Sequence, residues 1–295
     1  MAAATTTGST VPRRQLGRYL RELRNRARLT VRAAAAQLEW SEAKIWRIET
    51  GQTSLRSLDV ETMCRIYGAP ADLTEALMGL AKETKARGWW HSYGDVIPES
   101  FNVYIGLEEA ASRIACYESE LVPGLFQTED YARTIIRADN PGVHVAEIER
   151  RVHIRIARQA LLTRVTDPPT FQAVLNEAVL HRPIGDHAIM AHQLRRLVEI
   201  GALDNVSIRV MPFAAGLHHG ALSGPFVILR FPLNGAGQES EPPTVYAESL
   251  TGVLFLDRPR EIDRYDTAFR NMWESALDEK ASEDLIIHMA RELGK

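Results

Sequence analysis

The sequence contains few cysteines and no long apolar run, and each shortage excludes a class of protein. Two cysteines in 295 residues, Cys64 and Cys116, are too few for a disulfide framework and form no CxxC pair. No stretch approaches the roughly 18 consecutive apolar residues of a membrane span, and the first residues lack the apolar core of a secretory signal. We therefore expect a cytoplasmic protein that does not enter a membrane.

The signatures of common enzyme and cofactor sites are also missing. The chain contains no GxSxG nucleophile motif, no Walker loop, no dinucleotide-binding glycine fingerprint and no HExxH zinc motif. The sequence therefore predicts no enzyme, no catalytic residue, no metal site and no cofactor.

Charge is present but unevenly distributed. Residues 1–60 carry eleven Lys or Arg against five Asp or Glu, a net +6, which leaves −9 for the remainder because the whole chain carries −3. A basic segment joined to an acidic body is typical of a protein with one end that approaches a polyanion. The length is that of two domains, and the 45% hydrophobic content is ordinary for a globular protein.

The first 83 residues have the apolar spacing of short helices. Residues 1–11, rich in Ala and Thr, are expected to form a disordered tail, and 12–83 a helical bundle. The first helix begins near Arg13, and Thr30, Ser41 and Ser57 can open the second, third and fourth. The inward-facing positions of the five helices are Leu16, Leu20, Leu23 and Ala27; Ala34, Ala35 and Leu38; Ile45 and Ile48; Val60, Met63, Ile66 and Tyr67; and Leu73, Ala76, Leu77 and Leu80.

Several spacings within residues 16–67 agree with one known motif. They are LRELR in the first helix, LT before the second, the adjacent Ala34 and Ala35, the serine before the third helix and the ending IWRIETG. In this combination the segment resembles the Cro/repressor-type (XRE) helix-turn-helix regulators. The resemblance implies a five-helix DNA-binding domain with a third helix that enters the major groove of double-stranded DNA.

The third helix has the two faces that such a role requires. Ile45 and Ile48 point inward, which leaves a polar outer face. If the third helix docks as in the family, Glu42 accepts a hydrogen bond from cytosine N4 and Ala43 contacts a thymine methyl. Arg47 then donates two hydrogen bonds to guanine or to a phosphate. The full set of expected DNA-binding residues is Ser41, Glu42, Ala43, Lys44, Arg47, Thr50, Gln52 and Arg32, with phosphate contacts expected for Lys44, Thr50, Gln52 and Arg32.

Two charged residues are expected to be structural. The resemblance places Arg24 and Glu49 in an ion pair between the first helix and the end of the third. The sequence departs from the family at Val31, where a glutamine is usual, and at Glu39, where the turn usually has glycine. A left-handed Glu39 would cost about 1 kcal/mol or more. A bundle that binds only protein stays open as an alternative.

A Gly-, Pro- and aromatic-containing segment, 84–100, is expected to link this bundle to a larger α+β domain at 101–295. Strands are predicted at 112–118, 170–175, 206–211, 225–231, 244–248 and 253–256. Helices are predicted at 129–138, 145–163, 186–200, 261–277 and 282–293.

The second domain resembles the uncharacterised C-terminal domain of actinobacterial WhiJ-like, antitoxin-like regulators. The residues that carry the likeness include WWHSYGDVIP, YESELVPGLFQTEDYAR, RQALLTR, NEAVLHRPIG and the stretch from NVSIRV to ILRFP. The resemblance implies a sensing or partner-binding domain, with a small protein encoded nearby as a possible partner.

Weaker patterns in this domain leave other interpretations open. His218 and His219 lie among three glycines and could form a ligand loop, or the segment could be a plain connection between strands. Glu177, His181 and Arg182 could form a site or be satisfied polar groups at a strand end. The arginines at 151, 155 and 158 could form a partner surface or pair with acids.

The principal hypothesis is a sequence-specific transcriptional regulator that binds a palindromic operator as a homodimer. The alternative is an antitoxin-like protein-interaction module that neutralises or is controlled by a small partner protein and represses its own operon. Catalysis around His218 and His219 is a third hypothesis.

Overall fold

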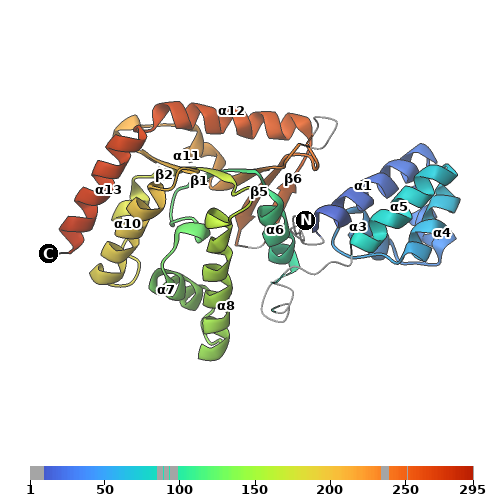
Figure 1. Ribbon diagram of the computed structural model, residues 1–295, viewed down its shortest axis with the longest axis horizontal. Helices are drawn as coiled ribbons and strands as arrows, with labels where there is room; N and C mark the ends of the chain where they lie inside the picture. The colour runs from blue at the N-terminus through green and yellow to red at the C-terminus, as the bar shows by residue number, and fades with distance from the viewer. Residues whose placement is uncertain are drawn as a thin grey trace. The chain divides into compact units, whose positions relative to one another are not determined.

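The computed structural model describes residues 10–84, 89, 93, 99–233, 239–250 and 252–294. The chain divides into two compact units, Met1–Ala110 and Ala111–Lys295 (Figure 1). The predicted fold class is confirmed: the first unit contains the helical helix-turn-helix bundle and the second is an α+β domain. Residues 1–9 of the predicted tail and most of the predicted linker, which includes Trp90, lie outside the described residues.

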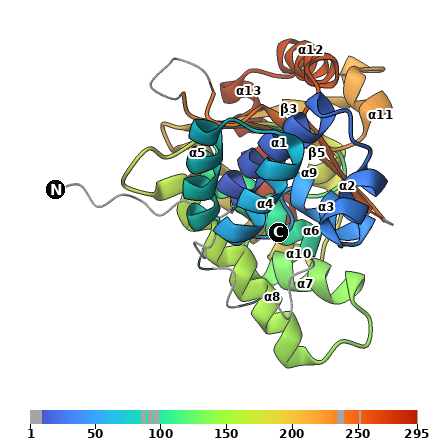
Figure 2. The ribbon, with the colours of Figure 1, turned by 90° about the vertical axis from the view of Figure 1, so that its right-hand side faces the viewer.

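In the residues that the structure describes, the first unit contains all five predicted helices and one further α-helix. The helices are α1 (Thr10–Arg26), α2 (Val31–Leu38), α3 (Glu42–Glu49), α4 (Ser57–Tyr67), α5 (Ala71–Glu83) and α6 (Glu99–Ala110). Leu20, Ile45 and Val60 are among the fully buried side chains of their shared core. α4 and α5 lie side by side in both views of the chain (Figure 1 and Figure 2).

Helix α1 begins at Thr10, earlier than its apolar stripe indicates. Thr10 is buried, and a Cβ added at Gly106 of α6 would lie 1.9 Å from its Oγ1. The start of α1 is therefore packed against α6, and residues 10 and 11 are helical rather than part of a tail. The sequence does not predict α6, because the buried residues of this helix are distributed around it instead of along one stripe.

Local chemistry sets the ends of the helices around α3. The Thr30 hydroxyl accepts the N–H of Ala33 at 3.1 Å, and the Ser41 hydroxyl accepts the N–H of Lys44 at 3.2 Å. Both are N-caps, as their residue types predict. Glu39 ends α2 at φ 55° and ψ 38°, the left-handed conformation that the family's glycine would take without strain.

The second unit is built on a six-stranded mixed sheet in the order β3-β2-β1-β4-β5-β6. Its strands are β1 (Arg113–Glu118), β2 (Thr170–Asn176), β3 (Val206–Met211), β4 (Phe226–Arg230), β5 (Thr244–Ser249) and β6 (Gly252–Leu256). β1, β2 and β3 are parallel, whereas β4, β5 and β6 join by antiparallel pairs. All six predicted strands are present, each within one residue of its predicted ends.

Helices cover the sheet on both faces. The longer ones are α7 (Glu129–Asp139), α8 (Val145–Ala157), α10 (His187–Gly201), α12 (Pro259–Ser275) and α13 (Glu279–Leu293). The shorter ones are η2 (Gly124–Phe126), η3 (Arg158–Thr163), α9 (Ala178–His181), η4 (Phe213–Ala215) and α11 (His219–Ser223). α12 packs Phe269 and Met272 against Tyr117 and Val174 on one face, and α7, α8 and α10 lie on the other side (Figure 1).

Three of the predicted helices in this unit differ from those observed by more than one residue. α12 begins and ends two residues before its predicted bounds of 261 and 277. The stretch predicted as one helix at 145–163 divides into α8 and the tighter turn η3. α13 begins three residues before its predicted start because the Asp278 carboxylate caps it and accepts the N–H of Ala281 at 2.7 Å. In the described part of the chain, no helix is long and apolar enough to cross a membrane.

Candidate nucleic-acid interface

Helix α3 presents one buried and one open face. Ile45 and Ile48 are 0% and 2% exposed and attach the helix to the core of the bundle. Glu42, Ala43 and Arg47 are exposed on the remaining surface. The helix therefore has a fixed orientation and a solvent-exposed outer face, and base readout in the major groove requires both.

The structure adds Trp46 to this outer face. The indole is 55% exposed, and Trp46 follows Glu42 by four residues and Ala43 by three. Residues at these spacings are neighbours on a helix surface. Trp46 is not among the DNA-binding residues expected from the sequence, although its place off the Ile45–Ile48 stripe indicates that its ring faces solvent.

The residues expected to hold phosphates lie around α3 in differing environments. Arg32 is exposed on the first turn of α2, whereas Lys44, Thr50 and Gln52 are partly buried. The Lys44 ammonium lies 3.3 Å from the centre of the Trp40 ring, a cation–π contact that restrains it.

The turn that follows α3, which contains Thr50 and Gln52, is also constrained. The Thr50 hydroxyl donates to the carbonyl of Trp46 at 2.8 Å, and the backbone N–H of Gln52 donates to the carbonyl of Arg47 at 2.8 Å. The position of Thr50 and Gln52 relative to the helix is therefore set by its C-terminal turn. Ser41, at the opposite end, is exposed and keeps its side-chain oxygen on the N–H of Lys44.

An ion pair joins Arg24 of α1 to Glu49 at the end of α3. The guanidinium donates from Nε to Oε1 at 2.6 Å and from Nη2 to Oε2 at 2.7 Å, and both residues are under 9% exposed. Nη1 donates to the carbonyl of Leu29 at 2.8 Å. The hydrogen bond to Glu49 raises the pKa of Arg24, and the negative charge of Glu49 raises this pKa further. The pair fixes the scaffold and does not face the outer surface of α3.

Helix α1 also approaches α3 through Gly17. A Cβ at this position would lie 2.4 Å from the carbonyl oxygen of Ile48 and 3.0 Å from backbone atoms of Glu49. Glycine is needed here because α1 meets the backbone of α3 directly. This close crossing and the Arg24–Glu49 pair together hold the end of α3.

The second unit brings together two of the weaker sequence patterns. Because β2 and β3 are parallel, their carboxyl ends share one edge of the sheet, and the segment between β3 and β4 crosses there. The Glu177 carboxylate accepts the N–H of Phe213 at 2.7 Å and lies 3.3 Å from Nε2 of His181. Glu177 thus holds in place the segment between β3 and β4, residues 212–225. Arg182 pairs instead with Glu120.

His218 and His219 do not act as a pair in this structure. His218 accepts the N–H of Gly220 on Nδ1 at 3.1 Å, and its Nε2 lies 3.4 Å from Nδ2 of Asn176. Burial, and then the charge of His219, lowers the pKa of His218, while His219 is exposed. Within the described residues there is no group of three or more His, Cys, Asp or Glu placed to hold a metal ion.

The arginines at 151, 155 and 158 are engaged rather than presented as a free stripe. Arg151 donates to Glu147 at 2.6 Å, Arg155 donates to Oε1 of Gln127 at 3.0 Å, and Arg158 is buried. Pairing with an acid is therefore the outcome for Arg151, whereas Arg155 bonds to an amide.

The segment between β3 and β4, residues 212–225, carries three exposed apolar side chains that are not among the site residues expected from the sequence. Phe213, Leu217 and Leu222 are 58%, 80% and 76% exposed. Isolated exposed apolar residues are common, but three of them lie within ten residues here, and contiguous apolar surfaces often bind other proteins.

Comparisons with known families match both parts of the chain. A model described as a helix-turn-helix domain matches residues 15–77, and a model described as a domain of unknown function (DUF5753) matches residues 101–288. No curated protein and no solved structure matches the chain.

Proposed function

Because the chain belongs to the family of the domain of unknown function DUF5753 and carries a helix-turn-helix domain, we propose that it is a sequence-specific transcriptional regulator of the cytoplasm. The observation that carries this proposal is the outer face of α3, which is exposed and carries Glu42, Arg47 and Trp46. Ile45 and Ile48 anchor the opposite face of the helix in the core.

The exposed residues suit base readout. Arg47 can donate two hydrogen bonds to guanine O6 and N7, Glu42 can accept from cytosine N4, and Ala43 can contact a thymine methyl. Trp46 offers a broad apolar surface beside them for a thymine methyl or a deoxyribose. Arg32, Lys44 and the turn after α3 would hold phosphates and set the register.

A single helix-turn-helix reads few base pairs, so we propose that two copies bind a palindromic operator. Two-fold symmetry of the protein then matches half-sites about one helical turn, roughly 34 Å, apart. The larger second unit would sense a signal or bind a partner.

The test is DNA binding by the full chain. Duplexes selected from a random pool by the wild-type protein are used in gel shifts with Arg47→Ala and with Arg137→Ala, an exposed arginine of α7. Arg47→Ala should bind about 10-fold or more weakly and discriminate less at one base pair, because a bidentate base contact contributes about 1–3 kcal/mol. Arg137→Ala should bind as wild type. Equal binding by both variants would remove Arg47 from the readout.

We also propose a second function for the second unit, an antitoxin-like one in which it binds a small protein encoded nearby. The exposed Phe213, Leu217 and Leu222 favour it, because exposed apolar side chains can belong to a protein-binding surface. Leu217→Ser with Leu222→Ser should abolish co-purification with that small protein, whereas Leu254→Ser, an exposed leucine of β6, should not. Retention of the partner by the double variant would contradict this assignment.

We propose no catalytic role for this chain. His218, one of the two histidines around which catalysis was considered, uses its Nδ1 to accept the backbone N–H of Gly220.

A further inference from the structure

β6 lies at the edge of its sheet but has the composition of an interior strand. It is the last strand in the order of the sheet, and its residues, 252–256, read GVLFL, without charge or proline. Val253 and Phe255 lie on one face of the sheet and Leu254 and Leu256 on the other, because successive side chains alternate. A strand that is apolar on both faces is typical of a sheet interior. Leu254 is nevertheless 57% exposed, so nothing in the described residues covers it fully.

The opposite edge of the sheet, β3, is protected by the chain itself. The Val210 N–H donates to the Ser282 hydroxyl at 2.9 Å, and the Val210 carbonyl accepts the N–H of Leu277 at 2.9 Å. Arg209, also on β3, donates to the carboxylate of Glu279 at 3.0 Å. The start of α13 and a charged side chain thus cover this edge, and both devices prevent a strand from pairing further.

The outer edge of β6 has neither protection in the part of the chain that the structure describes. Its ladder with β5 runs without a bulge from the pair Ser249 and Gly252 to the pair Val245 and Leu256. No strand other than β5 pairs with it there. A flat, apolar edge without charge, proline or bulge is a template for another strand.

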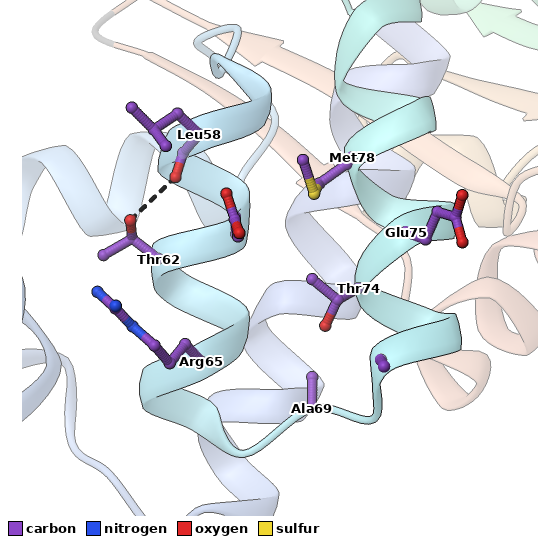
Figure 3. Close-up of a pocket in the computed structure, with 9 residues that line it drawn as sticks. Leu58, Thr62, Arg65, Ala69, Thr74, Glu75 and Met78 are labelled. Carbon is purple, nitrogen blue, oxygen red and sulfur yellow. Dashed lines mark hydrogen bonds between the residues drawn. The ribbon is translucent and has the colours of Figure 1, made fainter.

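The unpaired backbone distinguishes β6 from the exposed apolar residues of the helices. Leu58 is 65% exposed on α4, and Figure 3 shows its carbonyl accepting the Thr62 hydroxyl within the same helix. Met78 and Ala69, which lie nearby in that view, pack against the core of their own unit. A helix satisfies its own backbone groups, whereas the edge of a sheet needs a second strand to do so.

The ladder with β5 determines which residues of β6 direct their backbone outward. Ser249 and Gly252 are separated by two residues and share the hydrogen bonds that close the hairpin. In an antiparallel pair, residues alternate between bonding to the partner strand and pointing away from it. Leu254 therefore also bonds to β5, and the N–H and C=O groups of Val253 and Phe255 point to the open side.

We propose that a second copy of this chain adds its β6 antiparallel to this edge, so that the two sheets join across a two-fold axis at Leu254; this rests on the proposed function, which calls for two copies on DNA. Val253 of each copy then lies opposite Phe255 of the other, and the outward N–H and C=O groups of both bond to each other.

The symmetry of β6 favours a second copy over an unrelated strand. Its outward backbone groups lie at equal distances on either side of Leu254, so two identical strands satisfy one another in a single register. Gly252, which has no side chain, comes opposite Leu256 of the other copy and leaves room for it. Leu254 meets Leu254 of the other copy at a pair without hydrogen bonds, where side chains lie closest.

The contact is small. Five residues of strand extend over roughly 17 Å. Two such edges bury less than the roughly 1,200 Å² of a standard stable interface. The copies therefore associate and separate in solution, and the experiment has to trap the pair.

The experiment places a cysteine on the two-fold axis of the full chain, in the absence of DNA. Cys64 and Cys116 are both buried, so the thiol of Leu254→Cys is the accessible one. Oxidation with copper phenanthroline should give at least about 10-fold more disulfide-linked dimer for Leu254→Cys than for Leu222→Cys, because facing Cβ atoms at such a pair lie close enough for a disulfide. Leu222 is 76% exposed on α11 and serves as the control.

A second substitution tests the backbone pairing itself. Val253→Pro, added to Leu254→Cys, removes one outward N–H and leaves the ladder with β5 intact, since proline is tolerated on an edge strand. It should lower the yield of linked dimer about 10-fold, because the facing strand loses a ladder hydrogen bond and meets the proline ring. Val253→Ala keeps the N–H and should cross-link as Leu254→Cys alone does. Circular dichroism confirms that each variant is folded.

The outcomes separate this inference from the function on which it rests. Equal cross-linking of Leu254→Cys and Leu222→Cys overturns the second copy as the occupant of this edge. Undiminished cross-linking with Val253→Pro, or an equal loss with Val253→Ala, overturns the strand pairing. Neither result changes the gel shifts with Arg47→Ala, which test the proposed DNA readout separately.

Discussion

Arg24 and Glu49 illustrate how a charged residue in a DNA-binding domain can serve the scaffold instead of the ligand. Their two short hydrogen bonds are buried where α1 meets the end of α3. Removal of one partner leaves the other charge desolvated without compensation, whereas removal of both does not.

We therefore expect Arg24→Met to lower the free energy of unfolding of the first unit by about 3–5 kcal/mol. Glu49→Met should have a similar effect, and the double variant should be less destabilised than the sum of the two. Urea denaturation measures all three. Additive effects would show that the two side chains contribute independently and would contradict the coupling.

Glu118, on the last position of β1, gives a second residue-scale prediction. Burial, and to a smaller extent the charge of Glu248, raises the pKa of Glu118 to about 8. Glu248 itself accepts the Tyr246 hydroxyl at 2.9 Å. The pKa of Glu118 is higher in the folded chain than in the unfolded chain, so the folded chain binds this proton more tightly. Protonation of Glu118 therefore stabilises the folded chain, and this contribution to stability is lost as pH rises through about 8.

Thermal unfolding between pH 5 and 9 should show this loss, and Glu118→Gln should reduce it because the amide stays neutral. Glu129→Gln, an exposed acid of α7, serves as the control and should leave the pH profile unchanged. A profile identical in wild type and Glu118→Gln would contradict the assignment.

At the scale of the element, the turn between α2 and α3 holds a strained residue. Glu39 is exposed and left-handed at φ 55°, and its N–H donates to the carbonyl of Ala36 at 3.3 Å to end α2. A residue with a Cβ is disfavoured in this conformation by about 1–2 kcal/mol, and glycine is not.

Glu39→Gly should therefore raise the free energy of unfolding by about 1 kcal/mol. Gln37→Gly is the matched control, since Gln37 is an exposed residue inside the same helix, where glycine should lower stability by about 1 kcal/mol. Denaturant titration of both variants measures whether each substitution raises or lowers the free energy of unfolding. Destabilisation by Glu39→Gly would mean that the glutamate side chain contributes more than the strain costs.

At the scale of the whole molecule, charge is divided between the ends of the chain. The net +6 of residues 1–60 is outweighed by −9 in the rest, so the overall charge gives no indication of a polyanion partner. Phosphate binding then depends on cations near α3, and displaced counterions make the affinity fall with salt.

If Arg32 and Lys44 of two copies contact phosphates, the logarithm of the binding constant should fall with the logarithm of salt concentration with a slope of about −4. Arg32→Ala should reduce the slope by about 2, since it removes one contact per copy, and Arg137→Ala should not change it. Titrations from 50 to 300 mM KCl measure the slopes. A slope near zero for wild type would exclude phosphate contacts as the source of affinity.

The sequence by itself determined the local elements of this protein. The stripes of α1 to α5, the caps at Thr30 and Ser41 and the strand positions are encoded by neighbours within a few residues, so they could be predicted. Tertiary structure decided which distant residues meet. The contact of Glu177 with Phe213, the order of the six strands and the packing of α6 on Thr10 join residues tens of positions apart, and such contacts leave no periodic pattern in a sequence.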